Sequence, residues 1–364
     1  MGQLVHDLIS SDTGVTLRTS ANFWKREYLE KPEILAYLRH VVDRHDLRKY
    51  MQFNTEVQRA IYNDVDHLWT VSLSAGPRLT ARYIVTAVGL LSKINYPDIP
   101  GLKTYEGEMY HTGNWPASYD FTGKRVGVVG NGSTGVQLVT ALADQNVKQL
   151  LSFQRHPQNV VPAGYAEVPA ATQAKLDERW EQVWGEVRNS VLGFGLEESS
   201  KSTFSVSEEE RERIFEDAWA KGNGFYFMFG TFCDIFSDVE ANKAAAEFIR
   251  RKIRQKVKDP VKAEKLMPYD WYARRPLCDT GYYEKFNRAN VDVVNIGTNP
   301  ITQIINKGIR AADGSEYELD VLIFATGFDA VDGNYKRMHF QGALGETQES
   351  VEGGAQLFPR NLHP

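Results

Sequence analysis

Short apolar runs separated by polar stretches characterise the middle of the chain and predict alternating strands and helices. Residues 125–129 form a compact apolar run that predicts a buried strand, and apolar positions at helical spacing follow at residues 136–142. A second apolar run, residues 149–153, comes at the distance that a strand–helix–strand unit requires. Further buried strands are predicted for three similar runs, at residues 83–89, 291–294 and 321–325. The pattern indicates the α/β fold class.

The first 80 residues have a less regular pattern. Residues 1–20 are polar and show no sustained period, so we expect a loose arm. Apolar positions at helical spacing after Pro32 predict a helix that ends near Asp46. Short strands are expected beyond it, at residues 51–53, 56–61 and 69–73.

Residues 165–270 are predicted to form a helical insert. Ser207 and Glu210 have the spacing of a capping box, and residues 245–257 place apolar side chains on one face of another helix. Between these helices lies an apolar aromatic run bounded by glycines, residues 222–230. This run either lines a substrate passage or packs in the core, and packing is the commoner role for such residues.

The turn between the strand at 125–129 and its helix carries the pattern Gly-x-Gly-x-x-Gly. Gly130 permits the turn, Gly132 lets backbone amides approach a pyrophosphate, and Gly135 lets helix and strand pack closely. The helix N-terminus adds partial positive charge. The residues predicted to bind a dinucleotide here are Gly130, Asn131, Gly132, Ser133, Thr134, Gly135, Val136 and Gln137. A glycine-rich turn in an unrelated α/β domain is the alternative.

The second strand of this unit ends in Arg155 and His156, with no carboxylate at that place. An acid there favours a free ribose 2′-hydroxyl, whereas a cation favours a 2′-phosphate. The sequence therefore predicts NADP in preference to NAD, with Arg155 and His156 among the cofactor-binding residues.

Composition narrows the class of partner. The 364 residues have a formal net charge of −5, which provides no general attraction to nucleic acid or to an anionic membrane. The two cysteines are far apart and lack metal-ligand spacing, so we expect a reduced cytoplasmic protein without a metal site. No run approaches the ~18 apolar residues of a membrane span. Small molecules are the expected partners, and the oligomeric state is not predicted.

Three further motifs occur in a fixed order along the chain. Residues 105–116 contain Tyr105, Gly107, His111, Trp115 and Pro116. Residues 273–288 read Ala-Arg-Arg-Pro-Leu-Cys-Asp-Thr-Gly-Tyr-Tyr-Glu-Lys-Phe-Asn-Arg, and residues 325–329 read Ala-Thr-Gly-Phe-Asp. The first resembles the Phe-x-Gly-x-x-x-His-x-x-x-Trp-Pro fingerprint of Baeyer–Villiger monooxygenases, with Tyr in place of Phe, and the others resemble later segments of the same family.

The resemblance implies a two-dinucleotide-binding-domain, Rossmann-like flavoprotein architecture with a helical insert. It implies FAD and NADP as cofactors, a ketone as substrate, and an ester or lactone as product. Arg275 occupies the position of the arginine that stabilises the flavin peroxide in the family, where a permanently protonated group is needed. Arg274 stands where the family has Lys and would add charge near the 2′-phosphate. The resemblance also implies that Val57 belongs to the FAD-facing surface.

His111 has two interpretations on this resemblance. It is either a catalytic residue with a direct chemical role, or a packing residue that sets the geometry of the linker between the two dinucleotide-binding domains.

The resemblance covers residues 23–347 and implies the domain boundaries. A partial FAD-binding domain is expected at 21–103, a linker with the fingerprint at 104–118, and an NADP-binding domain at 119–164 and 271–330, interrupted by the insert. Residues 331–364 read as a divergent tail. The first Gly-x-Gly-x-x-Gly unit of the family has no counterpart in these 364 residues, so the FAD domain is expected to be incomplete and the chain truncated at both ends. The alternative function is therefore a degenerate, non-catalytic or non-redox NADP-binding relative that has lost FAD.

Overall fold

The computed structural model describes residues 30–89, 91–165, 178–190, 196–330 and 338–345, with the single residues 167, 169, 172, 175, 193 and 347. The predicted arm at 1–20 lies outside the described residues, as does most of the predicted tail. The chain divides into two compact units. Unit 1 comprises Met1–Leu47, Ile99–Met109 and Ser118–Ala325, and unit 2 comprises Arg48–Asp98, Tyr110–Ala117 and Thr326–Pro364.

The core strands of unit 1 belong to a five-stranded sheet in the order β4-β13-β5-β6-β9. The last four strands in this order run parallel, with Val321 beside Val126 and Arg125 beside Gln149. The bounds of the strands are Glu108–His111 (β4), Val321–Phe324 (β13), Arg125–Val129 (β5), Gln149–Gln154 (β6) and Val291–Asn295 (β9). The predicted α/β class is confirmed, and the strands predicted at 125–129, 149–153, 291–294 and 321–325 are all present.

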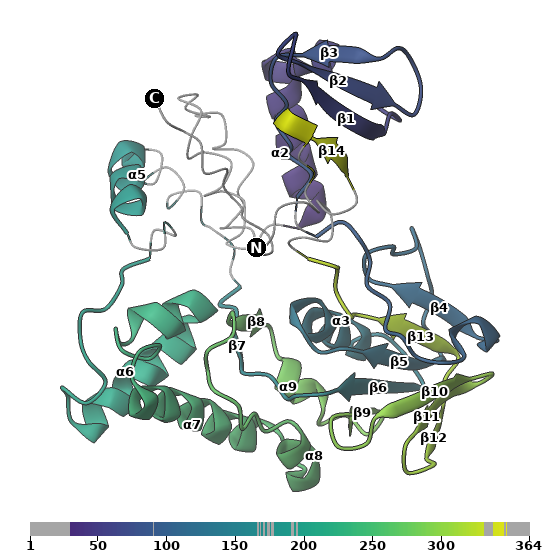
Figure 1. The fold of residues 1–364 in the computed structure, drawn as a ribbon. Coiled ribbons are helices and arrows are strands. Elements are labelled where there is room, and N and C mark those ends of the chain that lie inside the picture. Colours follow the sequence, from purple (N-terminus) through teal and green to yellow (C-terminus); the bar gives the residue numbers. More distant parts are fainter. Residues whose placement is uncertain are drawn as a thin grey trace. The chain divides into compact units, whose positions relative to one another are not determined.

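Helix α3 (Ser133–Ala143) connects β5 to β6 and completes the predicted strand–helix–strand unit (Figure 1). Its buried face carries Val136, Val139 and Leu142. The other face of the sheet packs against an antiparallel sheet of β10 (Ile301–Ile305), β11 (Gly308–Ala311) and β12 (Glu316–Glu318). One apolar cluster joins the two, with Phe153 and Phe324 from the first sheet and Ile304 and Ile309 from the second.

The described part of the predicted insert is mainly helical. It contains α5 (Trp180–Asn189), α6 (Glu208–Lys221), the π-helical turn η3 (Tyr226–Gly230), α7 (Val239–Lys256) and α8 (Pro260–Lys265). Ser207 caps α6 by accepting the N–H of Glu210 at 3.2 Å, as its spacing predicts. Phe227 and Met228 of the aromatic run are 1% exposed, so these two belong to the core. Phe225 and Phe229 are half-buried.

A two-stranded parallel sheet connects the insert to the Rossmann-like sheet. Strand β7 (Val160–Pro162) follows β6, and β8 (Leu277–Asp279) follows the insert and pairs with β7. Helix α9 (Tyr282–Lys285) comes next and contacts α3. Asn223 donates its N–H to the carbonyl of Pro162 at 3.0 Å, so the aromatic run begins at the end of β7.

Helix α2 (Lys31–Arg44) agrees with the helix predicted behind Pro32. It begins with a reciprocal capping box between Glu30 and Glu33.

Unit 2 contains a four-stranded sheet in the order β14-β1-β2-β3. Its strands are β14 (His339–Gln341), β1 (Val57–Asn63), β2 (Leu68–Leu73) and β3 (Leu79–Ala81), which confirms strands near 56–61 and 69–73. Two predicted strands were wrong, because residues 51–53 and 83–89 belong to no strand. Tyr83 and Val85 are 78% and 89% exposed, since no strand of the described residues pairs with this apolar segment.

Two predictions of absence concern the described residues alone. None of the helices that the structure describes is long and apolar enough to span a membrane. Among the same residues no group of three or more His, Cys, Asp or Glu could hold a metal ion. Cys233 and Cys278 are both free thiols.

Candidate functional site

The glycine pattern forms a tight corner between β5 and α3. Gly130 has φ +104°, a conformation that side chains with a Cβ rarely adopt, and its N–H donates to the carbonyl of Phe153 on β6 at 2.9 Å. A Cβ on Gly135 would lie 2.1 Å from the carbonyl oxygen of Gly130. Each glycine therefore has the role that the pattern predicts, one for the turn and one for close packing of helix and strand.

The N-terminus of α3 is open to an anion. Gly132 is the N-cap residue and provides no side-chain cap, and a Cβ placed on it would meet nothing within 4 Å. The N–H groups of the first helical turn have no acceptor within the helix, because no residue precedes them by four positions inside it. Ser133 and Thr134 of that turn are exposed. The corner therefore fits a pyrophosphate held by backbone amides and the helix dipole.

Asn131, Val136 and Gln137 are not equivalent within the motif. The Asn131 side chain is 7% exposed and donates to Gln154 Oε1 at 3.0 Å and to the carbonyl of His156 at 2.8 Å, which ties the turn to the end of β6. Val136 is 1% exposed and packs in the core, whereas Gln137 is exposed. Of the three, Gln137 has the side chain that an incoming ligand can reach.

The end of β6 carries the cations that the sequence singles out. Arg155 and His156 are both exposed, and Arg274 is brought beside His156 from the loop before β8. The carboxylate of Asp270 joins them: its Oδ2 lies 3.5 Å from Nδ1 of His156 and 3.3 Å from Nη2 of Arg274. Among the described residues, no carboxylate pairs with Arg155. Three cationic or potentially cationic groups and one acid therefore gather around this strand end.

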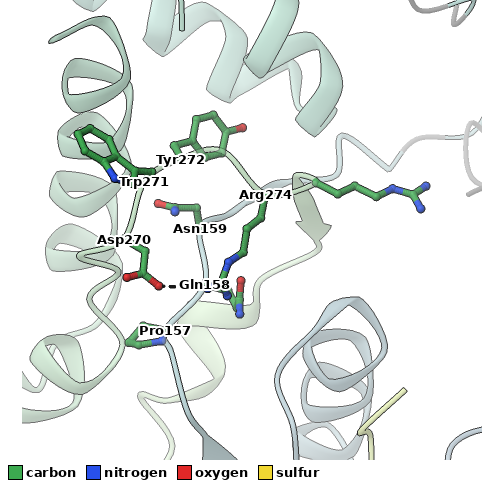
Figure 2. A pocket seen from close by; sticks show the side chains of 8 residues that line it. Pro157, Gln158, Asn159, Asp270, Trp271, Tyr272 and Arg274 are labelled. Carbon is green, nitrogen blue, oxygen red and sulfur yellow. Dashed lines mark hydrogen bonds and ion pairs between the residues drawn. The ribbon is translucent and has the colours of Figure 1, made fainter. Parts of the chain in front are cut away.

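Arg274 and Arg275 line a small pocket next to this cluster. The remaining lining residues are Pro157, Gln158, Asn159, Asp270, Trp271 and Tyr272. Figure 2 labels Arg274 together with these six residues. The Arg275 guanidinium carbon lies 5.9 Å from the centre of the Phe225 ring, so it faces the aromatic run of the insert. The sequence singled out the end of β6 and the two arginines from separate motifs. The structure brings these residues together around one pocket.

The strands beside this pocket are held by buried side chains that the motifs did not single out. The Tyr283 hydroxyl donates to the carbonyl of Gln158 at 2.7 Å and accepts the N–H of Val160 at 3.0 Å. Asp279, at the end of β8, accepts the hydroxyl of Thr140 on α3 at 2.6 Å. Tyr283 of α9 thus holds the segment after β6, and Thr140 of α3 holds the end of the strand that follows Arg275. The two helices contact each other.

Asp279 is an unusual carboxylate. It is 8% exposed, and burial raises its pKa to about 6, although hydrogen bonds from the Thr140 hydroxyl and the Thr280 backbone act in the opposite direction. The only sequence signal for it was its place two residues before the Gly-Tyr-Tyr segment. Asp270 had no signal at all.

His111 is the last residue of β4 and is 1% exposed. Its Nδ1 accepts the N–H of Gly113 at 2.9 Å, and its Nε2 lies 3.4 Å from the Thr326 hydroxyl. The rings of Tyr96 and Phe328 pack edge-on against it. Burial lowers the pKa of His111, with a partly opposing contribution from the backbone of Asn95 and Gly327. This geometry supports the packing interpretation, and a direct chemical role stays a prediction.

Val57 is the first residue of β1 in unit 2 and is 51% exposed. Its predicted contact with FAD stays a prediction.

Comparisons with known proteins extend the picture. A family model described as pyridine nucleotide-disulphide oxidoreductase matches residues 8–194. A phenazine N-monooxygenase from Lysobacter antibioticus is 50% identical over 324 residues, which are 89% of this chain and 60% of that protein. A Baeyer–Villiger monooxygenase from Pseudooceanicola batsensis is 50% identical over 328 residues, 90% of this chain and 60% of that protein.

Solved structures show the same similarity. Cyclohexanone monooxygenase from Rhodococcus sp. Phi1 bound to NADP⁺ matches with a TM-score of 0.85 and 53% identity, over 88% of this chain and 60% of that one. OTEMO in complex with FAD and NADP matches with a TM-score of 0.85 and 38% identity, over 89% and 61%. The chain spans about 60% of the length of these relatives. It belongs to the pyridine nucleotide-disulphide oxidoreductase family, within which its sequence and fold are similar to those of the Baeyer–Villiger-type flavin monooxygenases.

Proposed function

We propose that this chain provides the NADP-binding and oxygenation residues of an FAD- and NADPH-dependent monooxygenase of Baeyer–Villiger type. The observation that carries the proposal is the pairing of two features in unit 1. An open phosphate-binding corner stands between β5 and α3, and a pocket with two exposed arginines lies beside the end of β6. One feature suits a dinucleotide and the other suits chemistry in which negative charge develops on oxygen.

The residues of the corner fit NADP. The backbone amides of the first turn of α3 would hold the pyrophosphate, and Arg155 and Arg274 would contact the 2′-phosphate. Asn131 keeps the turn and the strand end in register, because its side chain donates to both Gln154 and His156. NADP in solved relatives of the same fold supports this assignment.

When bound, the nicotinamide supplies a hydride and the flavin supplies the redox chemistry with oxygen. The protein contributes position and charge. The Arg275 guanidinium can donate hydrogen bonds from a planar fork to an oxygen on which negative charge develops. It lines the pocket and faces Phe225, so the aromatic run of the insert forms part of its surroundings.

The proposed substrate is a small-molecule ketone, oxidised to an ester or lactone. Relatives at equal identity include a Baeyer–Villiger monooxygenase and a phenazine N-monooxygenase, so identity by itself does not separate a carbonyl from a ring nitrogen as oxygen acceptor. The ketone is supported by the similarity to cyclohexanone monooxygenase. The cytoplasmic location inferred from the two free thiols stays a prediction.

The proposal is tested by two measurements on the purified chain supplied with FAD. Calorimetric titration measures affinity for NADP⁺ and NAD⁺, and product analysis measures ester formation from cyclohexanone beside NADPH consumption. We expect tighter binding of NADP⁺, and formation of the lactone when FAD is supplied in excess, because the chain by itself is expected to hold FAD weakly. Equal affinity for both dinucleotides would contradict the assignment of the corner, and N-oxidation of phenazine without lactone formation would contradict the assignment of the substrate.

Replacing Arg155 tests most directly whether this site binds the 2′-phosphate of NADP. Arg155→Ala should weaken NADP⁺ binding by about 1–3 kcal/mol, the range for a charge-assisted contact, and leave NAD⁺ nearly unchanged. Arg188→Ala removes an exposed arginine of α5 and is the matched control. A preference for NADP⁺ that survives in Arg155→Ala would show that Arg155 does not contact the 2′-phosphate.

A further inference from the structure

The residues that end β6 in the sequence include no acid, but the fold places the carboxylate of Asp270 at this strand end. Asp270 precedes β8 by several residues, and tertiary packing places its carboxylate beside His156, just beyond β6. The side chain is 50% exposed and lines the same pocket as Arg275 and as Arg274 (Figure 2). Its Oδ2 lies within 3.5 Å of nitrogen atoms of two side chains that the sequence assigns to the cofactor, His156 and Arg274.

In dinucleotide-binding folds, the residue at the end of the second strand contacts the 2′ position of the ribose. The position of the Asp270 carboxylate is therefore relevant to the choice between NAD and NADP. An acid there accepts a hydrogen bond from the ribose 2′-hydroxyl of NAD and repels the 2′-phosphate of NADP. Arg155 and Arg274 attract the phosphate, while Asp270 subtracts one charge from this cluster. Opposing charges therefore act on the group that distinguishes the two cofactors.

We propose that Asp270 is a specificity-determining residue that limits the preference of this site for NADP over NAD. Its carboxylate neutralises part of the charge of Arg274 and provides an acceptor that a ribose hydroxyl can use. The inference rests on the proposed binding of NADP at this corner, and it concerns how strongly the site discriminates.

A purely orienting role for Asp270 leads to the opposite expectation. If Asp270 served to hold Arg274 toward the phosphate, its removal would weaken NADP binding. The geometry argues against this role. Both partners are at least half-exposed, at 57% for Arg274 and 50% for Asp270, and ion pairs at such exposure contribute little order. A phosphate with nearly two charges is in contrast repelled by any carboxylate within the screening length.

The test uses Asp270→Asn in the full 364-residue chain and a direct binding measurement. Calorimetric titrations with NADP⁺ and with NAD⁺ give the ratio of the two dissociation constants. We expect this ratio to move toward NADP⁺ by about 3- to 10-fold at low ionic strength and by less at high ionic strength, because salt screens the repulsion. Asp270→Glu keeps the charge and should leave the ratio within about twofold of the parent value.

Asp217→Asn is the matched control. Asp217 pairs with Arg213 at 3.1 Å across one turn of α6, with 68% of its side chain exposed, and Asp270 likewise pairs with an arginine four positions away. The control changes the net charge of the molecule by the same amount, so it should leave the cofactor ratio unchanged. Melting temperatures without cofactor verify that all variants fold.

The possible results separate the two proposals. If the unaltered chain binds neither dinucleotide, the proposed cofactor site fails and the inference fails with it. If the unaltered chain prefers NADP⁺ and Asp270→Asn leaves the ratio unchanged or shifts it toward NAD⁺, the site stands and the inference is overturned. A shift toward NADP⁺ that is insensitive to salt also overturns it, because repulsion between charges must weaken as salt rises.

Discussion

Arg275 is the residue on which the proposed chemistry depends most directly. Its side chain is exposed, it lines the pocket, and no carboxylate among the described residues forms an ion pair with it. Its full charge is therefore available to a ligand. The guanidinium of an arginine is always protonated and carries donors in a rigid plane, which suits an oxygen that gains charge during reaction.

Replacing Arg275 with Ala should lower the rate of ester formation by about 10²–10³, the usual loss for one group that stabilises developing charge. NADP⁺ affinity should change much less, because Arg155 and Arg274 remain. Arg275→Lys should not restore the rate, since a point charge on a flexible stem does not reproduce the fork. Product analysis beside NADPH consumption measures both effects. Ester formation at the parent rate in Arg275→Ala would show that Arg275 has only a structural role.

The buried environment of Asp279 should make the stability of the protein depend on pH. Its pKa is raised from 3.8 to about 6, first of all by burial. A carboxyl that binds its proton more tightly in the folded chain than in the unfolded chain favours folding most below its unfolded pKa. That contribution is then lost as the pH rises through about 6.

Asp279→Asn should remove this dependence while its amide oxygen still accepts from Thr140. Between about pH 4 and pH 7 the free energy of unfolding of the parent should fall relative to that of the variant by about 2–3 kcal/mol, as a shift of roughly two units implies. Denaturant unfolding of both proteins across this range measures the difference. Parallel curves for parent and variant would mean that the pKa of Asp279 is the same in the folded and unfolded chain.

At the scale of elements, α3 is the helix that unites the site. It begins at the open phosphate-binding corner, and its third turn carries Thr140, whose hydroxyl donates to Asp279 of β8. Its start packs so closely on the preceding turn that Gly135 has no room for a side chain. The helix therefore holds the corner and the strand after Arg275 in one rigid arrangement.

Gly132 and Gly135 form a matched pair for testing this packing. Gly135→Ala places a methyl group 2.1 Å from the Gly130 carbonyl oxygen. It should lower the free energy of unfolding by about 1–3 kcal/mol, the range for overpacking. Gly132 has φ −69° and open space around it, so Gly132→Ala should leave stability nearly unchanged. Thermal or denaturant unfolding without cofactor distinguishes them. Equal stability of the two variants would contradict the close contact of α3 with the turn.

At the scale of the whole molecule, the two units differ in how much apolar surface they bury. Within the described residues of unit 1, strands and helices enclose a core that includes Phe153, Phe248 and Phe324. The described residues of unit 2 bury few apolar side chains, Ala60 and Val71 among them, while Tyr83, Val85 and Leu91 are exposed. Unit 2 contains Arg48–Asp98, which is part of the segment 21–103 that the family resemblance assigns to the FAD-binding domain.

We expect the 364-residue chain by itself to hold FAD weakly. It contains one Gly-x-Gly-x-x-Gly pattern, in unit 1, and a pyrophosphate without such a turn and helix N-terminus loses its main electrostatic partner. Denaturing the purified protein and quantifying the released flavin gives the occupancy, with the bound NADP⁺ measured in the same sample as the control. Near-stoichiometric flavin would contradict the expectation.

The sequence by itself determined those parts of this protein that depend on neighbouring residues. Strands β5 and β6, helix α3 and the corner between them follow from local apolar periodicity and from three glycines, since the required backbone conformations are set within a few residues. Arg155 was singled out by its place at the end of the second strand, and Arg275 by the resemblance to a family segment. Their roles stay predictions.

Only the tertiary structure decided which distant groups meet. Packing of the insert places the Asp270 carboxylate beside His156, and packing of β8 places the Asp279 carboxyl in contact with Thr140. His111 is buried and Tyr83 is exposed although the sequence pattern left the first open and predicted burial for the second. Burial and charge depend on what the rest of the chain places nearby, and no local pattern contains that information.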